Sequence, residues 1–200
     1  MEKNRLEAFS DGVLAIVITI MVLEMKVPKA VEEVSHVANL TDLKPVLPVF
    51  LSYVLSFVYI GIYWNNHHHM LHATRHVTGG ILWANLHLLF WLSLFPFTTA
   101  WAGENHGAPT PIAVYGFALL MAAIAYYILE RAIIRHQGQN SILARAVGNR
   151  RKEYLSPLCY LAGIPLAYLN VGISIGLYVF VAVLWLVPDR RIERMVNEMR

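Results

Sequence analysis

The sequence has little charge and almost no cysteine. Only 14% of its 200 residues are charged, whereas soluble chains average about 25%. A soluble domain with so little charge has too few polar side chains to cover its surface. The single cysteine, Cys159, excludes an internal disulfide and any metal site built from a cysteine cluster.

Apolar residues take the place of the missing charge. They make up 57% of the chain, and the mean hydropathy is +0.50, which indicates an integral membrane protein. A membrane-crossing helix needs about 20 mostly apolar residues. We therefore predict an all-α membrane protein with one six-helix transmembrane domain, residues 1–200. Its expected spans are 6–27, 46–64, 77–101, 111–134, 154–169 and 172–187.

Proline positions support these spans. Pro28 follows the first span and Pro45 precedes the second, positions where the missing N–H of proline costs little. Pro96 and Pro165 fall inside spans, where we expect kinks that a membrane bundle tolerates. Asn170 and Gly172 supply the expected turn between the fifth and sixth spans.

The loops and the basic residues give the orientation. No loop exceeds about 20 residues, which leaves no room for a soluble catalytic domain, and we expect no enzyme activity. Cytoplasmic loops of membrane proteins carry an excess of Lys and Arg. All of the 16 basic residues except Lys26, Lys29 and Lys44 fall on the side of the two termini, which are therefore expected in the cytoplasm. Membrane lipid is an expected partner of these arginines, and nucleic acid is not.

The first span combines an aliphatic stripe with a polar end. Helical residues turn by about 100° each, which places Ile16, Ile20 and Leu23 within about 60° of one another, with Thr19 beside them. Ser10 falls well off this stripe. Such a stripe can pack on neighbouring helices or lipid, or it can line a pore, and periodicity alone does not distinguish these roles.

A short motif in this span resembles a known family. The run F-S-D-G-V-L-A-I over residues 9–16, with Arg5 one turn before it, resembles the signature of the transmembrane protein 175 family. The six expected spans, the run Trp64–His68, and Asn85 with Pro96 in the third span fit the same family.

The resemblance implies a potassium channel without cofactor, with K⁺ as the permeant ion. Bacterial members of the family imply a homotetramer in the plasma membrane, with a pore lined by the first helix of each subunit. By position, Ile16, Ile20 and Leu23 would form a hydrophobic filter and gate. Such rings offer K⁺ no ligands and close a pore by dewetting. Thr19 would add an oxygen there, or instead bond back to the carbonyl one turn earlier.

Polar residues away from the stripe predict a structural network. A charged or polar group this close to hydrocarbon needs a partner or water. We expect this network to fix the first helix on the cytoplasmic side. Its predicted members are Arg5, Phe9, Ser10, Asp11, Trp64, His67, His68 and Asn85.

The nine histidines raise two other interpretations. His68, His72 and His76 recur every four residues and would share one face of a helix, as in a Zn²⁺ site. No nearby carboxylate or cysteine completes such a site, so they are weak candidates and we expect no metal. His87 suggests a haem ligand, but no paired histidine at matching depth is evident. A histidine-ligated membrane redox protein and a secondary carrier, which should show two related halves, are the alternative functions.

Overall fold

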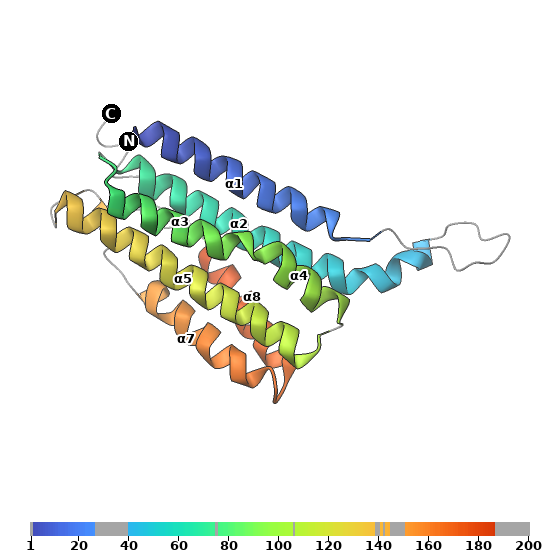
Figure 1. Ribbon diagram of the computed structural model, residues 1–200. Coiled ribbons are helices and arrows are strands. Elements are labelled where there is room, and N and C mark those ends of the chain that lie inside the picture. Colours follow the sequence, from blue (N-terminus) through green and yellow to red (C-terminus); the bar gives the residue numbers. More distant parts are fainter. Residues whose placement is uncertain are drawn as a thin grey trace.

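The computed structural model describes residues 2–26, 40–74, 76–105, 107–138, 141, 143–144 and 151–186. All regular secondary structure among them is helical, which confirms the all-α fold. The helices form an elongated bundle in which successive long helices run in opposite directions (Figure 1). They are α1 (Lys3–Leu23), η1 (Leu40–Val46), α2 (Leu47–His72), α3 (Gly79–Ser93), α4 (Phe95–Glu104), α5 (Pro109–Gln137), α7 (Arg151–Leu166) and α8 (Val171–Leu186).

Four helical segments are long and apolar enough to cross a membrane: Lys3–Leu23, Leu43–His72, Gly79–Glu104 and Pro109–Gln137. They correspond to the first four expected spans. Helices α7 and α8 have 16 residues each, or roughly 24 Å at 1.5 Å per residue, which is less than the roughly 30 Å hydrocarbon core. The count of six spans therefore stays a prediction. The expected ends at Val27 and Val187 lie outside the described residues.

The third expected span is two helices, because Pro96 interrupts it. Helix α3 ends at Ser93, and α4 begins at Phe95 with the proline in its first turn. A proline has no N–H to donate to the carbonyl four residues earlier. The interruption lies where the sequence predicts a kink.

Helix α2 continues to His72, well past the expected end of the second span at Trp64. The expected end is that of the apolar span, and the histidines beyond it are still expected on a helix. This last part of the helix buries His67, Met70 and Leu71 within the bundle. Burial of one face therefore stabilises the helix beyond its apolar run.

The connection between α7 and α8 is a tight turn around Asn170. Residues 167–169 form the turn, directly after Pro165 and the end of α7. The backbone N–H of Ile173 donates to the Asn170 side-chain oxygen at 3.3 Å, so Asn170 satisfies one of the free amides that begin α8. Asn170 is one of the two turn residues that the sequence predicts, and the other, Gly172, lies in the first turn of α8.

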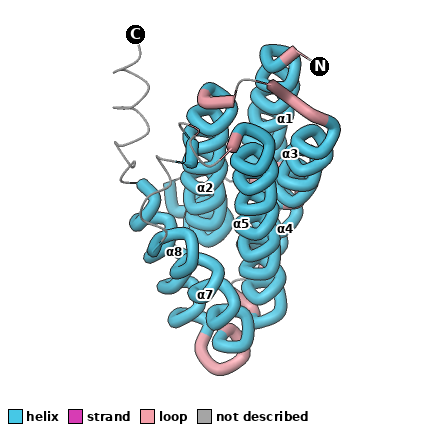
Figure 2. The backbone as a smooth tube through the Cα atoms, turned by 90° about the vertical axis from the view of Figure 1, so that its left-hand side faces the viewer, coloured by secondary structure: helices cyan, strands magenta, loops and turns pink. Residues whose placement is uncertain are grey.

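Helix α5 lies at the centre of the bundle. It packs on α3 and α4 on one side and on α7 and α8 on the other, as Figure 2 shows with α5 between the two groups. Ala118, Ala122 and Ala125 are buried along it. Such small side chains let membrane helices approach one another closely. Helix α1 packs on α2, α3 and α4, at the edge of the bundle away from α7.

Candidate pore-lining site

Helix α1 has one buried face and one exposed aliphatic face. Leu14, Val17 and Met21 are buried against the bundle. On the opposite side, Ile16 is 58%, Ile20 40% and Leu23 78% exposed. The expected stripe is therefore the face of α1 that this single chain leaves uncovered.

A groove runs beside this exposed face, between α1 and α4. It has a volume of about 570 Å³, and Ile16 and Ile20 line it together with Pro96 and Phe97. Glu24 and Glu104 lie at its end. An apolar groove next to an apolar helix face is typical of a surface that another helix covers.

Thr19 lies beside the stripe and is exposed. Its hydroxyl donates to the carbonyl of Ile16 at 2.9 Å. This is the back-bond that sequence reasoning offered as one of two possibilities.

The polar end of α1 is connected to α2 and α3 by a buried chain of hydrogen bonds. The Ser10 hydroxyl donates to the Leu6 carbonyl at 2.8 Å and accepts from the Asn85 side chain at 3.0 Å. The Asn85 oxygen lies 2.6 Å from Nε2 of His67. Because that amide oxygen only accepts, Nε2 of His67 carries the proton. Ser10, His67 and Asn85 are all fully or almost fully buried.

Asp11 makes a second connection to α2, at the surface. Its carboxylate accepts a hydrogen bond from the Trp64 indole N–H at 3.0 Å. The Trp64 ring stacks in turn on His68, with the ring centroids 6.2 Å apart. These are residues that the sequence places in one network, and their functional role stays a prediction.

Two expected members lie outside these contacts. Arg5 is exposed, and none of the side-chain hydrogen bonds or ion pairs within the described residues links it to the others. Phe9 is exposed on α1 and takes no part in the hydrogen bonds. Arg5 lies in the first turn of α1, where its long side chain reaches water directly and needs no protein partner.

Sequence reasoning missed the contacts that hold both ends of α1. Lys3 donates to the carbonyl of His72 at the end of α2, at 2.9 Å. At the other end Lys26 forms an ion pair with Glu104 at 2.5 Å. The hydrogen bond and the negative charge of Glu104 raise the pKa of Lys26 above its ordinary value. Neither residue pair has a sequence spacing that signals it.

The histidines do not form the expected face. His68 and His72 lie one turn apart on α2 with stacked rings, but the helix ends at His72 and His76 lies beyond it. The three residues therefore do not share a helical face. Within the described ranges, no group of three or more metal-ligating side chains could hold an ion. The Trp91 indole N–H donates a hydrogen bond to Nε2 of His87 at 3.0 Å. This is the nitrogen with which His87 would ligate a haem iron.

Comparisons with known proteins agree on one family. The family described as the endosomal/lysosomal potassium channel TMEM175 matches residues 5–96, which include most of α1 and the side chains of α2 and α3 that bond to Ser10 and Asp11. A potassium channel of Chryseobacterium sp. is 54% identical over 198 residues, which cover 99% of this chain and 100% of the relative. A potassium channel of Chamaesiphon minutus is 33% identical over 91% of this chain and 92% of its own length.

A solved structure gives the same assignment. The crystal structure of a lysosomal potassium-selective channel TMEM175 homolog from Chamaesiphon minutus superposes with a TM-score of 0.77 at 30% identity. The match covers 94% of this chain and 98% of that chain. The chain therefore belongs to the TMEM175 family.

Proposed function

We propose that this protein is a potassium-selective channel in which four copies of the chain surround one pore in the plasma membrane of a bacterium. Helix α1 of each subunit lines the pore. Ile16, Ile20 and Leu23 form its hydrophobic filter and gate, with Thr19 beside them. Potassium is the permeant ion, and neither catalysis nor a cofactor takes part.

The exposed aliphatic face of α1 is the observation that carries this proposal. Membrane helices expose apolar residues to lipid, but α1 also sits beside the groove between α1 and α4, which a second copy would fill. A single α1 helix cannot enclose an ion path. Rotational symmetry brings the same helix of each subunit to a common axis. The names of the bacterial relatives as potassium channels support the choice of ion.

The chemistry of the stripe determines how such a pore works. Aliphatic side chains offer a cation no ligands, so an ion passes only with part of its own water shell. In a narrow pore these rings exclude water and close it. In a wider pore, K⁺ passes more readily than Na⁺, because the weakly hydrated K⁺ loses part of its water shell at a lower cost in free energy. Glu24, exposed where α1 ends, would concentrate cations at the entrance.

The test is a flux measurement in liposomes under K⁺, Cs⁺ and Na⁺ gradients. We expect K⁺ flux to exceed Na⁺ flux in the unmodified protein. Ile16→Asn puts an amide in the proposed gate, which should raise the resting leak or reduce the preference for K⁺ about tenfold, a change of roughly 1.4 kcal/mol in relative barrier. The matched control is Ile173→Asn, because Ile173 is 50% exposed on α8 but is not part of the stripe.

Two results would contradict the proposal. One is the absence of ion flux from the unmodified protein over a range of pH and voltage. The other is an Ile16→Asn protein that conducts like the Ile173→Asn control, since a lipid-facing isoleucine would give that result.

A further inference from the structure

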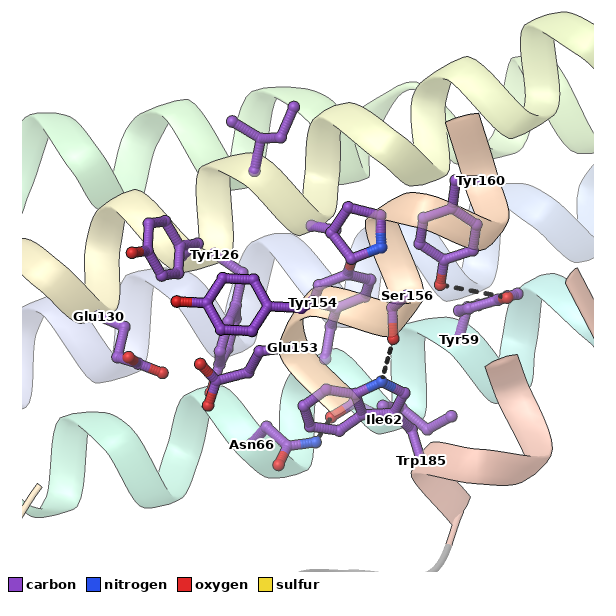
Figure 3. A pocket seen from close by; sticks show the side chains of 15 residues that line it. Tyr59, Ile62, Asn66, Tyr126, Glu130, Glu153, Tyr154, Ser156, Tyr160 and Trp185 are labelled. Atoms are coloured by element: carbon purple, nitrogen blue, oxygen red, sulfur yellow. Dashed lines mark hydrogen bonds between the residues drawn. The ribbon is translucent and has the colours of Figure 1, made fainter. Parts of the chain in front are cut away.

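A second cavity lies inside the bundle, on the side away from α1. Its volume is about 270 Å³, and α2, α5, α7 and α8 contribute its walls (Figure 3). Tyrosines from three of these helices, together with Trp185, make most of the wall aromatic. The cavity shares no lining residue with the groove beside α1, and so it has no part in the proposed pore.

Several polar groups of this wall already have partners within the protein. The indole N–H of Trp185 donates to the Ser156 hydroxyl at 2.8 Å. The hydroxyl of Tyr160 donates to that of Tyr59 at 3.3 Å. These hydrogen bonds hold the aromatic rings in place and leave their apolar surfaces facing the cavity, as Figure 3 shows.

Two carboxylates at one end of the cavity differ from the rest of the wall. Glu130 on α5 is only 4% exposed, and Figure 3 shows its carboxylate directed toward the side of α7 where the Glu153 carboxylate lies. One buried oxygen of each, Oε1 of Glu130 and Oε2 of Glu153, has no hydrogen-bond partner among the described residues. Both carboxylates line the same end of the cavity.

The neighbouring Arg131 offsets part of these charges from a distance but forms an ion pair with neither carboxylate among the described residues. The Arg131 guanidinium lies over the Tyr127 ring, 4.9 Å from its centroid. Buried carboxylates without a paired cation are costly. A cation from outside the chain would remove that cost.

We infer that this cavity binds a small amphipathic monoamine, with its ammonium group between Glu130 and Glu153 and its apolar body among the tyrosines. A primary ammonium has three donors and can serve both carboxylates at once. The aromatic walls suit an apolar or aromatic body and attract the cation further. A metal ion fits less well, because the wall beyond the two acids is mostly apolar and, in the described ranges, no third acidic or histidine ligand joins them.

The size and the opening of the cavity agree with this ligand. Drug-sized molecules occupy pockets of about 300–1,000 Å³, so a cavity of about 270 Å³ suits a molecule with one ring and a short chain. Tyr127 and Tyr154 are both lining residues and partly exposed, which places an entrance between α5 and α7.

The test is calorimetric titration of the purified full chain in detergent with 2-phenylethylamine. The neutral 2-phenylethanol has nearly the same shape and is the ligand control. Glu130→Gln and Glu153→Gln remove one charge each while keeping the side-chain shape. The matched control variant is Glu2→Gln, which changes an exposed acid at the start of α1, outside this cavity. Thermal unfolding of each variant establishes that it is folded.

We expect saturable binding of the amine, and binding of the alcohol at least about tenfold weaker, because a hydrogen bond to a charged group is worth at least that factor. Each cavity variant should lose about tenfold in affinity for the amine, and Glu2→Gln should bind like the unmodified protein. The inference would be overturned by equal binding of amine and alcohol, by no saturable binding up to about 10 mM, or by folded cavity variants that retain full affinity.

A lipid headgroup is the other source of a primary ammonium. The titration is therefore repeated in nanodiscs of phosphatidylglycerol with and without phosphatidylethanolamine. Equal affinity in both supports the free monoamine. Loss of amine binding only where phosphatidylethanolamine is present would mean that the lipid occupies the cavity, and would overturn the assignment. Ion flux is not measured, so failure here leaves the proposed channel function unaffected.

Discussion

Asn85 is the residue on which the packing of α1 depends most directly. Its amide donates to Ser10 of α1 and accepts from His67 of α2, so one side chain of α3 connects three helices. All three side chains are excluded from solvent. In such surroundings each polar group is costly when its partner is removed.

We predict that Asn85→Leu destabilises the protein strongly. Leucine has a similar volume but no polar atoms, so the His67 N–H loses its acceptor and the Ser10 hydroxyl loses its donor. A buried polar group left without a partner costs about 1–3 kcal/mol. The thermal unfolding midpoint of the detergent-solubilised protein, followed by tryptophan fluorescence, should fall clearly below that of the unmodified chain.

The control for this prediction is Asn105→Leu. The Asn105 side chain is exposed and donates to the Trp101 carbonyl at the end of α4. Its replacement should shift the midpoint by much less. If both leucine variants unfold at the same temperature, the buried hydrogen-bond chain does not hold α1 in place.

The sequence indicates which polar residues of α1 need a hydrogen-bond partner, but it does not determine whether that partner is another side chain or water. Ser10 and Asp11 both find partners on α2 or α3, as their position near hydrocarbon predicts. Arg5, which the same reasoning places with them, is exposed. The difference lies in side-chain length: an arginine reaches water from the end of a helix, and a serine does not.

At the scale of helices, α8 is held in place by one large side chain between two glycines. Tyr178 is completely buried. A Cβ at Gly116 of α5 would collide with its hydroxyl, and a Cβ at Gly163 of α7 would lie 2.5 Å from its ring. Tyr59 adds a hydrogen bond to the Tyr178 carbonyl at 2.6 Å. Three helices therefore meet at this tyrosine because two of them have no side chain there.

We predict opposite effects for the same substitution at two glycines. Gly116→Ala inserts a methyl group into the space of Tyr178 and should cost about 1–3 kcal/mol, the range for overpacked cores. Gly176→Ala lies on α8 with nothing within 4 Å of the added methyl. There the higher helix propensity of alanine should stabilise the protein by up to about 1 kcal/mol.

Thermal unfolding of both alanine variants checks this prediction. A Gly116→Ala protein that unfolds at or above the temperature of Gly176→Ala would contradict it. Adding Tyr178→Phe to Gly116→Ala removes the nearest clashing atom, and should recover part of the lost stability.

The existence of the helices could be predicted from the sequence, whereas contacts between them could not. Apolar runs and prolines are local signals, and they located α5 and the interruption at Pro96 correctly. The packing of Tyr178 between two glycines and the cavity beside Glu130 depend on residues that are far apart in the chain. Glu130 in particular looks from the sequence like an ordinary acid near the end of a span.

For the whole molecule, the uncovered face of α1 leads to a prediction about its assembly. If α1 lines a shared axis, Leu23 of each copy lies near Leu23 of its neighbours. Leu169 in the turn between α7 and α8 is about as exposed as Leu23, 82% against 78%. That turn lies on the side of the bundle opposite α1 (Figure 1). If exposure alone decided cross-linking between subunits, Leu23 and Leu169 would behave alike. A central pore lined by α1 brings only the Leu23 positions of different subunits together.

We predict that Leu23→Cys forms a disulfide between subunits and that Leu169→Cys does not, both in a Cys159→Ala background that removes the native thiol. A disulfide needs Cα atoms within about 7 Å, which a ring of α1 helices supplies only near its axis. Mild oxidation in membranes, followed by non-reducing electrophoresis, should give a dimer band for Leu23→Cys alone, and native mass spectrometry of the unoxidised protein should count four chains. Equal cross-linking at both positions would indicate random collision. A Leu23→Cys protein that stays monomeric on the gel would indicate that α1 does not lie at the subunit interface, and would contradict the proposed pore.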